Sequence, residues 1–350
     1  MASQATTGIR ALRRAATLVA AVLVALTVAG SGAAPAGARP TPTGSDQAPP
    51  PVSCITDSPV DPLGPGYLMD RGEFTTIDHP DAILETAPYG INNRGQIVGA
   101  YDTEGFVIHG FLLDGGRYTT IDVPHASRSL ALRINARGQI LDNYEDERGG
   151  CHGFLLYRSR LTTINVPGRP TQAVGLNDRG QIVGTYLDAQ GTTHGFLFDR
   201  GAYTTIDVPG AMRTAAVDIN ARGQILGLYL DAQGTTHGYV MDKGVVRDID
   251  VPGAMVTFPF GINNRGDVVG FYLDSALVRH AFLFENGVFT TTDHPLASAD
   301  SESHEINDRG QIVGLYERGR PVGTVEARAN AVASAGVPGP GEMWGTGSVR

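Results

Sequence analysis

Short hydrophobic segments alternate with polar, glycine-containing turns between about residue 66 and residue 316. In residues 215–252 these segments are Ala215–Asn220, Gln224–Tyr229, His237–Met241 and Val245–Val251. They are rich in β-branched and aromatic residues, and none shows the period of a helix. The turns between them contain glycine, which readily adopts the positive φ that tight turns need. The pattern therefore predicts four short antiparallel strands joined by hairpins.

This four-strand unit recurs along nearly the whole chain. The Asn of a Gly-Ile-Asn-x-Arg-Gly-Gln-Ile-Val-Gly block returns at spacings of 43, 42, 43, 43 and 44 residues, at Asn92, Asn135, Asn177, Asn220, Asn263 and Asn307. A fixed period of this length is typical of propellers, solenoids and arrays. Glycine makes up 46 of the 350 residues, about twice its usual share. Four short strands per unit and many tight turns favour the blades of a β-propeller.

The lengths of the links between strands indicate where each blade begins. The longest link, about ten residues, follows the Thr-Thr-Ile-Asp segment and starts with Val-Pro-Gly. Proline cannot donate to a strand ladder, so it suits a strand exit. We therefore expect this link to cross between blades. Each blade then runs from the axis to the rim as Ile-Asn, Gln-Ile-Val-Gly, His-Gly-Phe and Thr-Thr-Ile-Asp.

With these boundaries, the repeat region starts and ends in half a blade. It begins with two outer strands, Gly66–Asp70 and Glu73–Asp78, and ends with two inner strands, Glu305–Asn307 and Gln311–Tyr316. Five whole blades lie between the halves. We predict that the halves pair, which gives an all-β, six-bladed β-propeller with four antiparallel strands per blade and a ring closed by its two ends. The alternative is an open β array with terminal caps.

The two ends of the chain differ from the repeats. Residues 1–38 read as a secretory signal peptide, with Arg10, Arg13 and Arg14 before an apolar stretch and Ala-Gly-Ala at residues 36–38. An uncleaved membrane anchor is the rival interpretation, although the apolar stretch is short for a span. We expect a Pro-rich linker at 39–65, the propeller at 66–317 and a disordered Gly-, Ala- and Pro-rich tail at 318–350.

Charge and cysteine content narrow the possible partners. The signal holds three of the 27 basic residues and no acidic one, which leaves 24 basic against 36 acidic residues and a net charge of −12. Such a chain repels phosphate backbones, so we expect no nucleic-acid partner. We predict a soluble, secreted, extracellular protein and a monomer. Its two cysteines, Cys54 and Cys151, form a disulfide or remain two unpaired thiols.

The repeats resemble the HAF family of extracellular repeat proteins, named after a His-Ala-Phe signature. His280-Ala281-Phe282 matches this signature, and four other copies have His-Gly at His109, His152, His194 and His237. The first copy departs from it, with Gly66-Tyr67 and no histidine. The resemblance covers about residues 66–316. It implies export and repetition, and it implies no particular reaction.

Two sets of repeated residues are candidates for chemistry. The five histidines lie one per blade, too far apart to share a metal ion, so we expect each to bond a neighbouring turn. Every Asn-x-Arg-Gly turn carries an arginine, and these six could ring one mouth of the axis and hold an anion: Arg94, Arg137, Arg179, Arg222, Arg265 and Arg309. The alternative is simple repetition, in which each arginine is solvated or pairs locally.

Positions that break the repeat are the second source of candidates. The residue before Ile-Asn is Gly90, Gly175 or Gly261 in three copies, and Arg133, Asp218 or Glu305 in the others. These three charged residues could form a site at a propeller mouth, although drift between repeats would give the same picture. The second unit also replaces a strand glycine with Asp142-Asn143.

Several motifs that mark known activities are absent from the sequence. The acidic turns lack the Asp-x-Asp-x-Asp pattern of calcium loops, and no Gly-x-Ser-x-Gly or His-Glu-x-x-His motif occurs. We expect no metal and no cofactor. The favoured function is a non-catalytic scaffold that binds a surface, a glycan or a protein partner. The alternative is an extracellular polysaccharide hydrolase or lyase with carboxylates in the propeller mouth.

Overall fold

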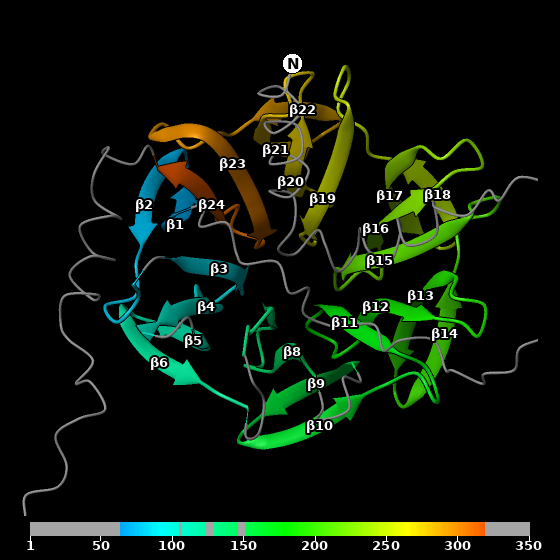
Figure 1. Cartoon of the computed structure of the whole chain (residues 1–350), viewed down its shortest axis with the longest axis horizontal. Coiled ribbons are helices and arrows are strands. Elements are labelled where there is room, and N and C mark those ends of the chain that lie inside the picture. Colours follow the sequence, from blue (N-terminus) through cyan, green and yellow to red (C-terminus); the bar gives the residue numbers. More distant parts are fainter. Residues whose placement is uncertain (1–63, 84, 105–106, 124–128, 146–150, 319–350) are drawn as a thin grey trace, which may run out of the picture.

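Six four-stranded antiparallel sheets surround a central axis in the computed structural model (Figure 1). The structure describes residues 64–83, 85–104, 107–123, 129–145 and 151–318. The predicted six-bladed β-propeller is therefore confirmed. The predicted signal peptide, the linker up to residue 63 and the tail from residue 319 lie outside the described residues.

Five blades are continuous in sequence, and their strands run in order along the chain. Blade 1 comprises β3 (Thr86–Ile91), β4 (Ile97–Thr103), β5 (Val107–Asp114) and β6 (Arg117–Ile121). Blade 2 comprises β7 (Arg133–Ile134), β8 (Ile140–Glu145), β9 (Cys151–Tyr157) and β10 (Arg160–Ile164). Blade 3 comprises β11 (Thr171–Leu176), β12 (Ile182–Leu187), β13 (Thr193–Asp199) and β14 (Ala202–Ile206). Blade 4 comprises β15 (Arg213–Ile219), β16 (Ile225–Leu230), β17 (Thr236–Asp242) and β18 (Val245–Asp248). Blade 5 comprises β19 (Val256–Ile262), β20 (Val268–Leu273), β21 (Arg279–Glu285) and β22 (Val288–Thr291).

Blade 6 joins the two ends of the repeat region. It has the order β2–β1–β24–β23, with β1 (Gly66–Asp70), β2 (Glu73–Ile77), β23 (Ala297–Ile306) and β24 (Ile312–Arg318). Antiparallel pairing of β1 with β24 places Tyr67 opposite Gly314, and the Tyr67 hydroxyl lies 2.9 Å from Ser303 Oγ on β23. The ring is thus closed as predicted, and the open array is excluded.

The inner strand of blade 6 is longer than the sequence pattern suggested. β23 begins at Ala297, whereas its hydrophobic pattern indicated a start at Glu305. Each inner strand of blades 1 and 3–6 also has a β-bulge just before its end, as between Ala216 and Asp218 of β15. A bulge redirects the following side chain. Here it aims the residue before Ile-Asn toward the axis.

Blade 2 departs from the other five because of one residue. In the other blades the second strand carries a glycine so close to the inner strand that an added Cβ would meet a carbonyl oxygen at 1.9–2.1 Å: Gly99, Gly184, Gly227, Gly270 and Gly314. Blade 2 has Asp142 there. Its Oδ2 accepts a hydrogen bond from the Leu130 backbone nitrogen at 3.0 Å, and the inner strand β7 has only two residues. The Asp142 side chain thus takes the place of part of the backbone hydrogen bonding between the first two strands of blade 2.

Candidate functional site

Six asparagine side chains join the blades at one end of the axis. Each Nδ2 donates to the backbone oxygen of the equivalent asparagine in the next blade at 2.9–3.3 Å, and the six bonds form a closed ring through Asn92, Asn135, Asn177, Asn220, Asn263 and Asn307. Each Oδ1 also accepts from backbone nitrogens of its own turn, such as Arg94 N at 2.9 Å. The repeated asparagine of this asparagine ring is therefore architectural.

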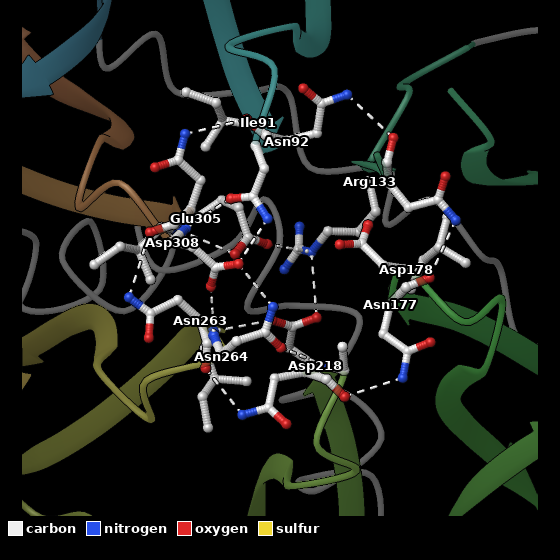
Figure 2. A pocket seen from close by; sticks show the side chains of 18 of the residues that line it. Ile91, Asn92, Arg133, Asn177, Asp178, Asp218, Asn263, Asn264, Glu305 and Asp308 are labelled. Atoms are coloured by element: carbon white, nitrogen blue, oxygen red, sulfur yellow. Dashed lines mark hydrogen bonds and ion pairs between the residues drawn. The ribbon is translucent and has the colours of Figure 1, made fainter. Parts of the chain in front are cut away.

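A polar pocket of about 60 Å³ lies at the asparagine ring (Figure 2). It is lined by the ring, by the isoleucines and leucine that precede it, and by residues that follow it, including Asp178, Asn264 and Asp308. The pocket is wide enough for a few water molecules or one small polar group. It is the strongest candidate site in the described part of the chain.

Arg133 lies at the centre of this pocket and bridges opposite blades (Figure 2). Its Nε is 2.9 Å from Glu305 Oε2 and 3.9 Å from Asp218 Oδ1. Its Nη2 donates to the backbone oxygen of Phe260 in blade 5 at 3.0 Å, and its Nη1 donates to that of Tyr89 at 3.1 Å. The structure thus brings together the three charged residues singled out by sequence. It places them inside the axis, where the Arg133 side chain is only 3% exposed, rather than in loops at a mouth.

The three glycines at the intervening positions make room for these charged side chains. An added Cβ would lie 2.7 Å from Asp218 Cα at Gly175 and 2.8 Å from Glu305 Cα at Gly261. At Gly90 it would lie 3.0 Å from the backbone oxygen of Leu132. Glycine and a charged residue therefore alternate around the axis because six side chains would not fit. The variation at this position is a packing requirement of the closed ring.

Arg133, Asp218 and Glu305 form an axial trio with two carboxyl groups and only one guanidinium. Burial raises the pKa of Glu305 well above its ordinary value, and the neighbouring Asp218 raises it further. Burial also raises the pKa of Asp218, although Arg133 opposes this shift. Each carboxylate accepts a backbone hydrogen bond, from Ile306 N to Glu305 and from Ile262 N to Asp218. These shifts favour a trio that retains one proton and is neutral as a unit.

A second ring of residues lies directly after the asparagine ring, at Asn93, Ala136, Asp178, Ala221, Asn264 and Asp308. Within this second ring, the side chain in one blade accepts a hydrogen bond from the backbone nitrogen in the preceding blade. Ala136 N donates to Asp178 Oδ1 at 2.7 Å, and Asp308 N donates to Asn93 Oδ1 at 2.8 Å. Asn264 accepts from Ala221 N and Asp308 accepts from Asn264 N in the same way.

The six turn arginines are all exposed at this end. Two of them bind the next turn: Arg222 Nη1 donates to Asn264 O at 3.2 Å, and Arg265 Nη1 donates to Asp308 O at 2.5 Å. Arg265 also pairs with Asp267 at 2.7 Å. The guanidinium groups of the other four have no hydrogen bond or ion pair with a described side chain or backbone group: Arg94, Arg137, Arg179 and Arg309. Anion binding by this set stays a prediction.

The repeat histidines connect a strand to neighbouring turns. His109 Nδ1 lies 3.0 Å from Asp122, and the distance from His237 Nδ1 to Asp250 is 2.7 Å. In blades 3, 4 and 5 the other ring nitrogen faces a second aspartate, as in the 3.4 Å contact of His237 with Asp231. The hydrogen bond to Asp250 raises the pKa of His237. Among the described residues, no group of three His, Cys, Asp or Glu side chains is arranged to hold a metal ion.

Sequence reasoning missed a buried polar network further along the inner strands. Glu302 accepts from Arg279 Nη1 and lies 3.3 Å from His304 Nε2, while His304 Nδ1 lies 3.0 Å from the backbone oxygen of Pro88. The signal was present: residues 300–305 read Asp-Ser-Glu-Ser-His-Glu, where other copies are mostly apolar. Of this run, the sequence pattern placed only Glu305 in a strand.

Three buried carboxyl groups in this region differ in their electrostatic environments. Burial raises the pKa of Glu85 to about 8, with further contributions from the charges of Asp102 and Glu302. Burial also tends to raise the pKa of Glu302, but Arg279 and His304 outweigh it and the pKa is lowered. Burial raises the pKa of Asp142 to about 7. A protonated and an ionised carboxyl group therefore occur in the same region at neutral pH.

Comparisons with known proteins bear on the fold. No family model matches the sequence, and no curated protein matches it. The structure is similar to that of a putative TolB from Agrobacterium tumefaciens, with a TM-score of 0.57 and 15% identity, over 74% of this chain and 99% of that chain. TolB from Acinetobacter baumannii gives a TM-score of 0.48 at 15% identity, over 74% and 65% of the two chains. At such identities the likeness shows the propeller fold alone.

The described residues contain no helix that is long and apolar enough to cross a membrane. Cys54 lies outside the described residues, and Cys151 begins β9. The disulfide between them therefore stays a prediction.

Proposed function

We propose that this chain is a secreted, HAF-type repeat protein that binds a glycan, without catalysis, at the asparagine-ring end of its axis. The observation that carries the proposal is the polar pocket on a frame of fixed hydrogen bonds. Side chains held in place before binding lose little freedom when a ligand arrives, which favours affinity. Amide and carboxylate groups in a small open pocket suit the hydroxyl groups of a sugar.

The positions of large exposed hydrophobic residues favour a glycan over a protein around the axis at this end. Protein interfaces are usually anchored by buried aromatic or aliphatic side chains. Met212 and Met255 are more than half exposed, but their backbone nitrogens bond Leu230 and Leu273 at the far ends of β16 and β20. They therefore lie at the end of the propeller opposite the asparagine ring. Val245 and Val288 are similarly exposed and lie at the asparagine-ring end, but on the outermost strands β18 and β22, so the region around the axis is polar.

The carboxylates at the pocket are already committed to structural bonds. Asp218 and Glu305 are buried beneath the ring and pair with Arg133. Asp308 accepts three N–H donors, from Asn264 N, Asn264 Nδ2 and Asn93 Nδ2, at 2.7–2.8 Å. A general acid or base needs a free path to the reacting group. These groups support binding rather than hydrolysis at this end.

The alternative is an extracellular polysaccharide hydrolase or lyase, and one observation favours it. Glu85, with its pKa raised to about 8, lies near the ionised Glu302. Two carboxyl groups whose pKa values are pushed apart are the usual acid and base of glycoside cleavage. Both are almost fully buried, at 8% and 6% exposure, so a substrate would need an opening at this place.

A glycan-binding screen on the purified protein tests the proposal. Acidic and neutral oligosaccharides are immobilised, and each one that binds is then incubated with the protein and analysed for cleavage products. The proposal expects saturable binding with no product. Product formation that Glu85→Gln abolishes would favour the enzyme. Absence of binding to every glycan would contradict the proposal.

A further inference from the structure

The second ring is incomplete at two of its six junctions. In four junctions the backbone N–H of one blade donates to an Asp or Asn side chain of the next blade. The N–H groups of Asn93 and Asp178 instead face blades whose equivalent residue is Ala136 or Ala221, which has no acceptor. Neither N–H has a hydrogen-bond partner within the described part of the chain.

The turn itself does not require alanine at these positions. All six turns have the same Asn-x-Arg-Gly sequence pattern and the same hydrogen bond from the glycine nitrogen to the asparagine oxygen, at 2.9–3.1 Å. Four of them hold Asn or Asp at the second position. Ala136 and Ala221 therefore leave a space where an Asx oxygen lies elsewhere.

We propose that these two spaces are sockets for carboxylate groups, so that the ligand is a glycan containing uronic acid. This inference rests on the proposed function, and it names the ligand class. In the four filled junctions, an Asp or Asn oxygen takes the N–H at 2.7–2.8 Å. A ligand carboxylate presents the same planar oxygen acceptor, and its charge strengthens the bond.

Unpaired arginines distinguish the first socket from the second. Arg94 follows Asn93 and Arg137 follows Ala136, both are exposed, and neither guanidinium group has a partner among the described residues. Around the second socket, Arg179 is unpaired but Arg222 already donates to Asn264 O. Two carboxylates flank the first socket, and both are already held by hydrogen bonds: Asp178 accepts from Ala136 N and Asp308 accepts from Asn93 Nδ2. The first socket, above Ala136, is thus the stronger anion site.

Filling the sockets with the side chains found in the other blades tests the inference. Titration calorimetry compares trigalacturonate with the neutral trimer of galactose, on the purified protein and on Ala136→Asn, Ala221→Asn and the double variant. Loss of a charge-assisted hydrogen bond is expected to weaken trigalacturonate binding by about tenfold or more in Ala136→Asn. Ala232→Asn, in an exposed turn of blade 4, is the matched control and should bind as before.

Stability provides a second readout of the same variants. Ala136→Asn adds an acceptor for Asn93 N–H, so its melting temperature should rise or stay constant while its affinity falls. Arg137→Gln should also weaken trigalacturonate binding, whereas Arg247→Gln on the rim strand β18 should not.

Two results would overturn the inference. Unchanged trigalacturonate affinity in a folded Ala136→Asn variant would show that the socket is not used. Equal affinity for the neutral trimer would show that no carboxylate is recognised, and the proposed function would still stand. If neither trimer nor any other glycan binds, the proposed function itself fails.

Discussion

Asn307 donates from Nδ2 to the backbone oxygen of Asn92, at 3.1 Å, across 215 positions of sequence. This bond completes the asparagine ring at the junction between blade 6 and blade 1. It complements the pairing of β1 with β24, which joins the two ends of the chain within blade 6. The propeller is therefore closed at two levels, by a sheet and by a ring of side chains.

The asparagine ring should contribute measurably to stability. Asn307→Asp keeps the Oδ1 acceptor of the turn but removes the Nδ2 donor to Asn92 O and to Gln311 Oε1. Asn92 O still accepts from Gly95 N, but a carboxylate oxygen would now face this buried carbonyl in place of a donor. We therefore expect a loss of about 1–3 kcal/mol in the free energy of unfolding. Urea denaturation measures this loss. Gln233→Glu makes the same chemical change on an exposed turn, and an equal effect of both would argue against the ring.

Arg133 should be essential to the axial trio. Arg133→Met removes the only positive charge between Asp218 and Glu305 and should cost about 3–5 kcal/mol, the usual loss when one partner of a buried ion pair is removed. The triple variant Arg133→Met, Asp218→Asn, Glu305→Gln removes the charges together and should recover most of that loss. Denaturant titration of both variants checks this, and a stable single variant would contradict the structural role of the trio.

Stability should fall as the pH rises from mildly acidic to alkaline values. The pKa of Glu85 is raised to about 8 and that of Asp142 to about 7, whereas unfolded carboxyl groups titrate near pH 4. The folded chain then holds more protons between these values, so stability is lost as pH rises through about 4 to 8. The raised pKa of His194, His237 and His280 acts in the same direction above about pH 6.5.

A thermal melt at pH 5.5 and pH 8.5 measures this dependence. The melting temperature should be higher at pH 5.5, and Glu85→Gln should reduce the difference. The lowered pKa values of His79 and His294 oppose the trend below about pH 6.5, where the unfolded chain binds more protons. The lowered pKa of Glu302 opposes it only in more acidic solution, where protonation removes its stabilising charge. A higher melting temperature at pH 8.5 would contradict the assignment of protonated buried carboxyl groups.

The glycine of the second strand should be intolerant of any side chain. Gly227→Ala would place a Cβ 2.1 Å from the backbone oxygen of Ala215, so the inner strand of blade 4 must move. We expect a loss of about 1–3 kcal/mol in the free energy of unfolding.

In blade 2 the reverse change, Asp142→Gly, restores the repeat residue and should lengthen the pairing of β7 with β8. Hydrogen exchange at Leu130–Leu132 would show greater protection, and unchanged exchange would contradict this reading of blade 2.

Much of the architecture was predictable because it depends on periodic features. The spacing of Asn92 and its equivalents indicated the number of units, and the Val-Pro-Gly links indicated the blade boundaries. The two half-blades at Gly66 and Tyr316 then predicted closure. The length of β23 was missed because its Ser-Glu-Ser-His run is polar, and buried polar residues are recognised only when their partners are known.

The candidate site was only partly predictable. Arg133, Asp218 and Glu305 could be selected because they break the repeat, but their burial depends on the bulges before Asp218 and Glu305 and on the glycines between the three residues. The significance of Ala136 could not be read from sequence at all. It depends on Asn93 N–H facing that residue across a blade junction, and this is a relationship of the folded ring.

A crystal structure of the protein with trigalacturonate tests the central claim most directly. The account predicts a uronate carboxylate above Ala136, within hydrogen-bond distance of Asn93 N and in contact with Arg94 or Arg137. A ligand bound between the outer strands, or at the opposite end of the axis beside Glu85 and Glu302, would contradict it.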